Sequence, residues 1–305
     1  MMRAPDSGSS RVSIHLTWFR KRSASQVGLP FRRLCAQGSA STTWNSCRRK
    51  ISCNQGWTKE SEWISKNITR SSNVILAALS NDEYQRIFPK LEFIPLELGT
   101  ILYNSGDQIK DVYFPGTGVV SLVRHMKEKV TVEVGVIGKE GMVGIPVILG
   151  DDFSFEAAVV QMKGDAMRMS TPALKKELKS GNSRLITQLL AFTRTLMKQV
   201  TQTAACNRIH SIEQRLSRWM LMCRDRMGSD ELALTQEFIA NMLGSRREGV
   251  SIAATILQQR NLIRYSRGHI SILDKKGLEK FSCECYRATQ EMNGTRSNMY
   301  DNAHK

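Results

Sequence analysis

The sequence predicts an α+β protein, and three patterns along its 305 residues carry that prediction. Between residues 91 and 169, short apolar runs alternate with Gly, Asp and Pro, which is typical of an antiparallel β-barrel or sandwich. From residue 183, apolar residues recur at the spacing of one long helix. Near the C-terminus, a helical pattern stops at Gly244 and restarts at once, and two short alternating strands follow.

Most of the net charge of +16 lies before these regions. Residues 1–72 carry 13 basic and 3 acidic side chains without apolar periodicity, so we expect a disordered basic extension. A basic arm on DNA, an organellar transit peptide and sequence translated from a wrongly chosen start codon are alternative explanations of this segment. Residues 206–280 hold a further net charge of +5.

No apolar run approaches the roughly 18 residues of a membrane span, and no signal-peptide core is evident. We therefore expect a soluble, cytoplasmic protein that contacts no membrane. The seven cysteines form an odd set without Cys-x-x-Cys units, which argues against a disulfide scaffold or a structural zinc site, so no metal is predicted. The alternative is an iron–sulfur cluster on Cys35, Cys47, Cys53 and Cys206, whereas burial is expected for Cys206 and Cys223.

The first folded region is assigned to residues 73–180. One or two short helices are expected after Asn73, and a tight hairpin turn is expected at Gly106, since glycine accepts a positive φ. Thr171 and Pro172 predict the start of a short helix that ends near Gly181.

The long helix is assigned to residues 181–206. Its apolar positions recur at four, three and four residues, which is the seam of a two-stranded coil: Leu185, Leu189, Phe192 and Leu196. The same stripe is also what a helix needs to pack on its own barrel. Because Ile186, Met197 and Val200 widen the apolar surface, we predict a homodimer with the four stripe residues at its interface.

Residues 207–286 contain a second pattern, which predicts a helix-turn-helix. A helix capped by Thr235 ends at Gly244, which tolerates the left-handed conformation, and a second helix begins near Ser245 or Arg246. Ala240, Gly244 and Val250 fall at spacings of four and six, those of a helix crossing, its turn and a buried residue.

The second helix of such a motif places its first residues toward base edges in the DNA major groove. Four residues are therefore expected to read bases: Arg246, Arg247, Glu248 and Ser251. An arginine can bind guanine O6 and N7 together, and a glutamate accepts from cytosine N4. The alternative is a solvated helix start beside an ordinary turn between two helices.

The segment "NLIRYSRGHISIL" favours the DNA-binding interpretation, because it predicts a hairpin directly after the second helix, as in a winged helix. Residues on the hairpin and at the two helix starts are expected at phosphates, which position a domain without reading sequence: Thr235, Ser245, Arg264, Arg267 and His269.

Together with "TAACNRIHSIEQRLSRW" and "LTQEFIANMLGSRREGVS", these segments resemble a bacterial Crp/Fnr-family transcription regulator over roughly residues 73–286. The resemblance implies a cyclic-nucleotide-binding-like β-roll, a long dimerisation helix and a C-terminal winged helix-turn-helix. It further implies a homodimer on palindromic double-stranded DNA, with RNA polymerase as a further partner. The family's Arg-Glu pair falls on Arg247 and Glu248, but the basic residue that some members carry four positions later is Ile252 here.

The β-roll departs from the cyclic-AMP-binding pattern of that family. The corresponding stretches supply the candidate effector pocket: Gly141, Met142, Val143, Gly144, Phe155, Glu156 and Ala157. No arginine precedes Ala157, and Glu156 would repel a phosphate. We therefore predict an effector other than cyclic AMP, or none, and no required cofactor.

Three residues after the long helix are expected to form a hinge between the two domains: Asn207, Arg208 and His210. The alternative is a set of hydrogen bonds that fixes one orientation. Residues 287–305 form a polar tail. No His-Glu-x-x-His pair, Gly-x-Ser-x-Gly elbow or phosphate loop is present, so no catalytic residue is assigned. The competing functions are a ligand-binding signalling module that does not bind DNA and a cyclic-nucleotide-responsive regulator.

Overall fold

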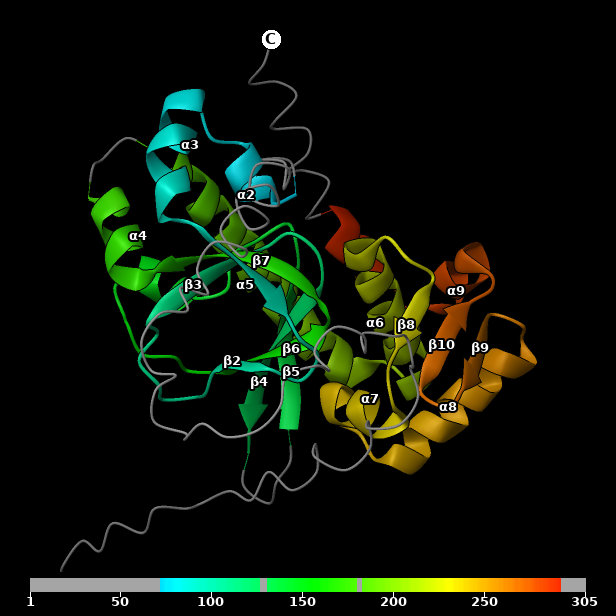
Figure 1. Ribbon diagram of the computed structural model, residues 1–305. Helices are drawn as coiled ribbons and strands as arrows, with labels where there is room; N and C mark the ends of the chain where they lie inside the picture. The colour runs from blue at the N-terminus through cyan, green and yellow to red at the C-terminus, as the bar shows by residue number, and fades with distance from the viewer. Residues whose placement is uncertain (1–71, 127–130, 180–182, 292–305) are drawn as a thin grey trace, which may run out of the picture. The chain divides into compact units, whose positions relative to one another are not determined.

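The computed structural model describes residues 72–126, 131–179 and 183–291 (Figure 1). The predicted basic extension, with Cys35, Cys47 and Cys53, and most of the predicted polar tail lie outside this part of the chain. The described residues combine antiparallel sheets with helices, so the predicted α+β fold class is confirmed.

Two antiparallel sheets form the first region, as the short apolar runs predicted. One has the order β1-β7-β3, with strands Glu92–Leu96, Gly164–Ser170 and Asp111–Pro115. The other has the order β2-β6-β4-β5, with strands Ile101–Tyr103, Ala157–Met162, Val119–His125 and Thr131–Ile137. Apolar side chains from both sheets share one core, which also contains the short 3₁₀ segment η3, Ile145–Leu149.

The hairpin predicted at Gly106 is wrong, although its positive φ of 86° is observed. The strands on either side of this turn do not pair with each other, because β2 pairs with β6 and β3 pairs with β7. The glycine reverses the chain between the two sheets. A positive φ marks a turn but does not say which strands the turn joins.

Short helices flank the sheets. Two precede them, as expected: α2, Val74–Ala77, and α3, Asn81–Ile87, which is followed by the 3₁₀ turn η1, Phe88–Lys90. Helix α3 begins at a capping box in which Ser80 and Glu83 each bond the other's backbone amide. After β7, helix α4 spans Thr171–Leu178, and its cap is Ser170 rather than the predicted Thr171.

The predicted apolar stripe of helix α5, Arg184–Ile209, packs against the β-roll of the same chain. Leu185, Leu189 and Phe192 are at most 1% exposed, and with Leu196 they belong to the β-roll core. These four residues therefore do not form a dimer interface, and the prediction that placed them there is wrong. The heptad pattern correctly predicts an apolar helix face, but it does not specify whether the chain's own β-roll or a second copy covers that face. Leu190 and Met197, on another face of α5, are exposed.

The C-terminal region is a helical domain with a small sheet. Its labelled helices are α6, α7, α8 and α9, at Ile212–Met227, Gln236–Leu243, Arg247–Gln259 and Lys275–Phe281, and residues 285–291 are helical as well. Its sheet has the order β8-β10-β9, with strands Glu231–Ala233, His269–Ile272 and Ile263–Ser266. Strand β8 was not predicted, because three residues are too few to show an alternating pattern.

A buried polar group joins α6 to the β-roll. Trp219 Nε1 donates to Glu133 Oε1 at 3.0 Å, and Ser121 Oγ lies 2.7 Å from Glu133 Oε2. Ser121 also makes a short hydrogen bond to Gln161 Oε1. Since a hydroxyl carries one hydrogen, both Ser121 contacts are satisfied when Glu133 is protonated and donates to Ser121.

Desolvation raises the pKa of Glu133 to about 7, and its hydrogen bonds with Ser121 and Trp219 only partly oppose this rise. The unfolded carboxyl ionises near pH 4.5, so the stabilisation from protonated Glu133 is complete below that pH. It is lost as the pH rises through about 7.

Glu133→Gln should therefore flatten this part of the pH dependence of stability. One unit of pKa shift corresponds to about 1.4 kcal/mol, so the wild-type protein should lose up to about 3 kcal/mol between pH 5 and pH 8 through this group. Urea denaturation at both pH values measures the loss, with exposed Glu97→Gln as the control. An equal pH dependence in wild type and Glu133→Gln would contradict the assignment.

Candidate nucleic-acid interface

The turn between α7 and α8 has the geometry that the sequence predicted. Thr235 caps α7 by accepting from the Phe238 amide at 3.2 Å. Gly244 ends the helix in the left-handed region with φ 55° and ψ 44°, and the Ser245 amide donates back to Ala240 O at 2.9 Å. This bond closes the helix end as in a Schellman motif, so the chain can begin a new helix after one turn.

The crossing of the two helices is packed by small and branched residues. Ala240 on α7 and Val250 on α8 are both buried in the core of this domain, as expected from their spacing to Gly244. Helix α8 begins at Arg247 with Arg246 as its cap, one or two residues later than predicted.

The start of α8 presents polar and charged side chains outward. Arg246, Arg247 and Glu248 are exposed, and Ser251 is half-buried. Ile252, one turn after Glu248 on the same helix, is 60% exposed. This face therefore offers two guanidinium groups, a carboxylate, a hydroxyl and one apolar side chain.

The predicted hairpin lies next to this helix in the sequence and has a tight turn. Arg267 and Gly268 occupy the turn with φ 49° and 81°, and strand β9 pairs with β10 from His269↔Ser266 to Ile272↔Ile263. Arg264, Arg267 and His269 are exposed. The wing therefore carries two permanent positive charges and a histidine in solvent.

Three polar side chains hold these elements in place. Tyr265 on β9 donates to Leu234 O at 3.0 Å, and its own amide donates to Gln258 Oε1 of α8 at 2.9 Å. Arg215 of α6 makes a short hydrogen bond to Leu243 O at the end of α7. Specific hydrogen bonds thus join the wing to α8 and to the residue before the α7 cap, and join the end of α7 to α6.

The candidate effector residues do not converge on a pocket. Met142, Val143 and Ala157 are fully buried among apolar side chains, and Gly144 packs against Val112. A Cβ on Gly141 would lie 2.1 Å from the Phe192 ring, so the ring fills that space. The Phe192 ring of α5 thus fills the space beside Gly141, and the side chains of Met142 and Val143 are buried in the apolar core, so the structure does not present these three predicted pocket residues to a ligand.

The remaining candidates lie toward the surface. Phe155 is 67% exposed, and the Arg124 guanidinium stacks on its ring at 3.9 Å from the centroid. Glu156 is half-buried beside it in the sequence. The Arg124 guanidinium is thus engaged by an aromatic ring and by Phe155 O, rather than presented to an anion.

The predicted hinge residues lie where α5 gives way to α6. Asn207 and Arg208 are in the last turn of α5, and His210 is its C-cap. Ser211 then caps α6 with a capping box that includes Gln214. His210 lies close to three cysteines, an arrangement that the sequence reasoning missed because two of them follow more than seventy residues later.

The comparisons with known proteins agree with this geometry. The family described as the Crp-like helix-turn-helix domain matches residues 214–281. Residues 214–281 form a Crp-like helix-turn-helix domain. No curated protein matches the chain at the level required for a relationship.

Solved structures extend the likeness to the β-roll. A protein assigned to the Crp/Fnr regulators from Eubacterium rectale is 21% identical, with a TM-score of 0.55, and the match covers 69% of this chain and 98% of that one. A CRP-family transcriptional regulator from Thermus thermophilus is 18% identical, with a TM-score of 0.52 and coverage of 62% and 96%.

A third structure is a global regulator from Xanthomonas campestris that responds to cyclic di-GMP, at 14% identity, TM-score 0.54 and coverage of 64% and 100%. The chain therefore has the Crp/Fnr fold, a cyclic-nucleotide-binding-like β-roll followed by the Crp-like domain, and the predicted resemblance is confirmed. No helix within the described residues is long and apolar enough to cross a membrane.

Proposed function

We propose that this protein is a transcription regulator that binds palindromic double-stranded DNA as a homodimer. The observation that carries the proposal is the exposed start of α8, Arg246 to Glu248, in a Crp-like domain that also exposes a basic wing. A protein of this class is not an enzyme, and no reaction is assigned to it.

Base reading is assigned to the first turns of α8. Arg247 suits guanine, because its guanidinium can bond O6 and N7 together, and Glu248 suits the amino group of cytosine. Arg246 and Ser251 flank this pair. Exposed Ile252 adds an apolar group suited to the methyl group of thymine, so the preferred site should differ from that of relatives with a basic residue there.

Phosphate contacts are assigned to the wing and the helix starts. Arg264, Arg267 and His269 are exposed on the hairpin, while Ser245 directly precedes the cap of α8 and Thr235 caps α7. Thr235 Oγ1 accepts from the Phe238 amide, which leaves its hydroxyl hydrogen to donate to a phosphate oxygen.

The dimer is assigned to the outer face of α5. Leu190 and Met197 are one heptad apart and are 50% and 65% exposed, with Ala204 a further heptad along. Apolar residues at heptad spacing on an exposed helix face suit a parallel pair of helices. This face replaces the buried seam that the sequence analysis selected.

A signalling module without DNA binding is the alternative function. It would be favoured if the rest of the chain covered Arg246 and Arg247, but both side chains are exposed. Cyclic-nucleotide sensing is also disfavoured, because Phe192 packs against Gly141 and no arginine precedes Ala157. Regulation of transcription requires RNA polymerase as a further partner. We expect the protein in the cytoplasm, where the DNA and the polymerase would be found.

Selection of bound sequences from a random DNA pool by the full-length chain tests the function. We expect an inverted repeat whose half-sites lie about one helical turn, roughly 34 Å, apart. Affinity for the enriched site should fall steeply with salt, since phosphate contacts release counterions. No enrichment, with or without added cyclic nucleotides, would favour the module that lacks DNA binding.

Arg247→Ala and Arg267→Ala should affect binding differently. Loss of the Arg247 base contact should cost about 1–3 kcal/mol on the enriched site and relax the preference at one base position. Arg267→Ala should weaken binding to enriched and random DNA about equally, because a phosphate contact reads no sequence. Titrations on both DNAs measure the effects, and equal losses for Arg247→Ala would remove its assigned role.

Met197→Glu should shift the protein from dimer to monomer, because it places two like charges across the proposed α5 interface. Leu149→Glu is the matched control, since Leu149 is 64% exposed but lies in η3 rather than on α5. Sedimentation velocity of both variants and of the wild type measures the change. A dimer that survives Met197→Glu would place the interface elsewhere.

A further inference from the structure

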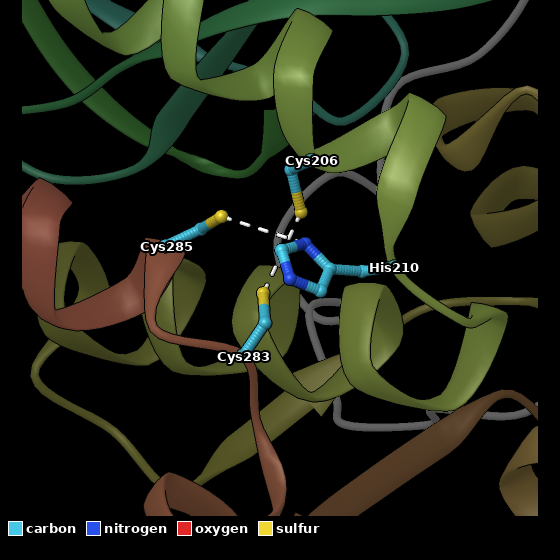
Figure 2. Close-up of side chains that lie close together, drawn as sticks. All are labelled: Cys206, His210, Cys283 and Cys285. Atoms are coloured by element: carbon cyan, nitrogen blue, oxygen red, sulfur yellow. Dashed lines mark hydrogen bonds between the residues drawn. The ribbon is translucent and has the colours of Figure 1, made fainter.

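Four potential metal ligands from two distant segments converge at the end of α5 (Figure 2). Cys206 and His210 lie four residues apart at the last turn and cap of this helix. Cys283 and Cys285 follow α9. One ligand atom from each residue lies within 4.8 Å of the others.

The spacing of these atoms suits a single ion. Cys206 Sγ lies 3.5 Å from Cys283 Sγ, and Cys285 Sγ lies 3.6 Å from His210 Nδ1. In a tetrahedral zinc site with Zn–S bonds near 2.3 Å, neighbouring sulfurs are roughly 3.8 Å apart. Three thiolates and one imidazole are also an established donor set for structural zinc.

The surroundings of His210 match those of a metal-bound histidine. Nδ1 faces the sulfurs, while Nε2 lies 3.2 Å from Glu284 Oε1. A ligating histidine commonly donates its second ring N–H to a carboxylate, which fixes the tautomer and the orientation of the ring. Gln202 Nε2 also donates to Cys285 Sγ at 3.0 Å, as expected for a hydrogen bond to a thiolate.

A buried arginine lies where it could balance the negative charge of such a metal site. A divalent ion with three thiolates and a neutral imidazole carries one negative charge. Arg218 of α6 is 5% exposed, and its guanidinium interacts electrostatically with the Cys206 thiol. Within the described residues, Arg218 Nε has no hydrogen-bond partner, although its NH2 group donates to Thr203. A buried cation beside the cluster would balance the bound complex.

Ordinary packing explains this cluster less well. The three cysteines form a buried group of their own, separate from both large apolar clusters of the described chain. A disulfide between Cys206 and Cys283 would leave Cys285 and His210 without a common role. Cys283 and Cys285 have Cys-x-Cys rather than Cys-x-x-Cys spacing and lie far along the chain from Cys206, so the sequence pattern does not reveal the cluster.

We propose that Cys206, His210, Cys283 and Cys285 bind a Zn²⁺ ion that fastens the end of α5 to the segment following α9. The ion links the helix that leaves the β-roll to the last part of the C-terminal domain. This inference does not depend on whether the protein binds DNA.

Metal analysis of the purified full-length protein by mass spectrometry tests the proposal. We expect about one zinc ion per chain, retained after exchange into metal-free buffer. Cys285→Ser and His210→Ala should lose the zinc. His210→Cys should retain it, since four thiolates also bind zinc. Cys223→Ser is the matched control, because Cys223 is buried but lies outside the cluster.

Two further measurements separate the site from other cysteines and other chemistry. Replacing Cys35, Cys47 and Cys53 by serine should leave the zinc content unchanged. Cobalt added to protein stripped of metal should give the intense visible bands of a tetrahedral thiolate site in the wild type and not in Cys285→Ser. A protein that binds neither zinc nor cobalt, that contains iron instead, or that forms a Cys206–Cys283 disulfide would overturn the proposal.

Discussion

The burial of one face of α5 against its own β-roll is the constraint on which the rest of the structure depends. Leu185 and Leu189 fill the core, and Gln199 bonds both the amide and the carbonyl of Val136 on β5, at 3.2 and 3.1 Å. These bonds fix the rotation of the helix as well as its position. Its outer face, with Leu190 and Met197, is therefore left exposed, and its last turn places Cys206 beside Cys283 of the C-terminal region.

A second set of contacts connects the β-roll to α6. Besides the Trp219–Glu133 hydrogen bond, buried Arg226 of α6 donates to Glu140 Oε1 at 2.8 Å. The ion pair is enclosed, so breaking it would leave a charge away from water. Because α6 packs against α8, these polar contacts and the apolar cluster shared by the two regions together set the orientation of α8.

The sequence predicted the C-terminal domain better than the β-roll. Thr235, Ala240, Gly244 and Val250 specify a turn through local chemistry, namely a cap, a small residue, a positive φ and a buried branched residue. The pairing of strands and the partner of the α5 seam are set by contacts between distant segments, which a local pattern does not encode. For the same reason the sequence pattern assigned Gly141 to an effector pocket, although the ring of Phe192, from a distant segment, occupies the space beside this glycine.

That contact couples two positions far apart in the chain. Since the ring of Phe192 lies where a side chain on Gly141 would stand, the sizes of the two residues cannot vary independently. A larger residue at 141 would be accommodated only with a smaller one at 192, or with a displacement of α5. Because α5 leads directly into α6, a displacement of α5 caused by one added methyl group at residue 141 would also move the domain that contains α8.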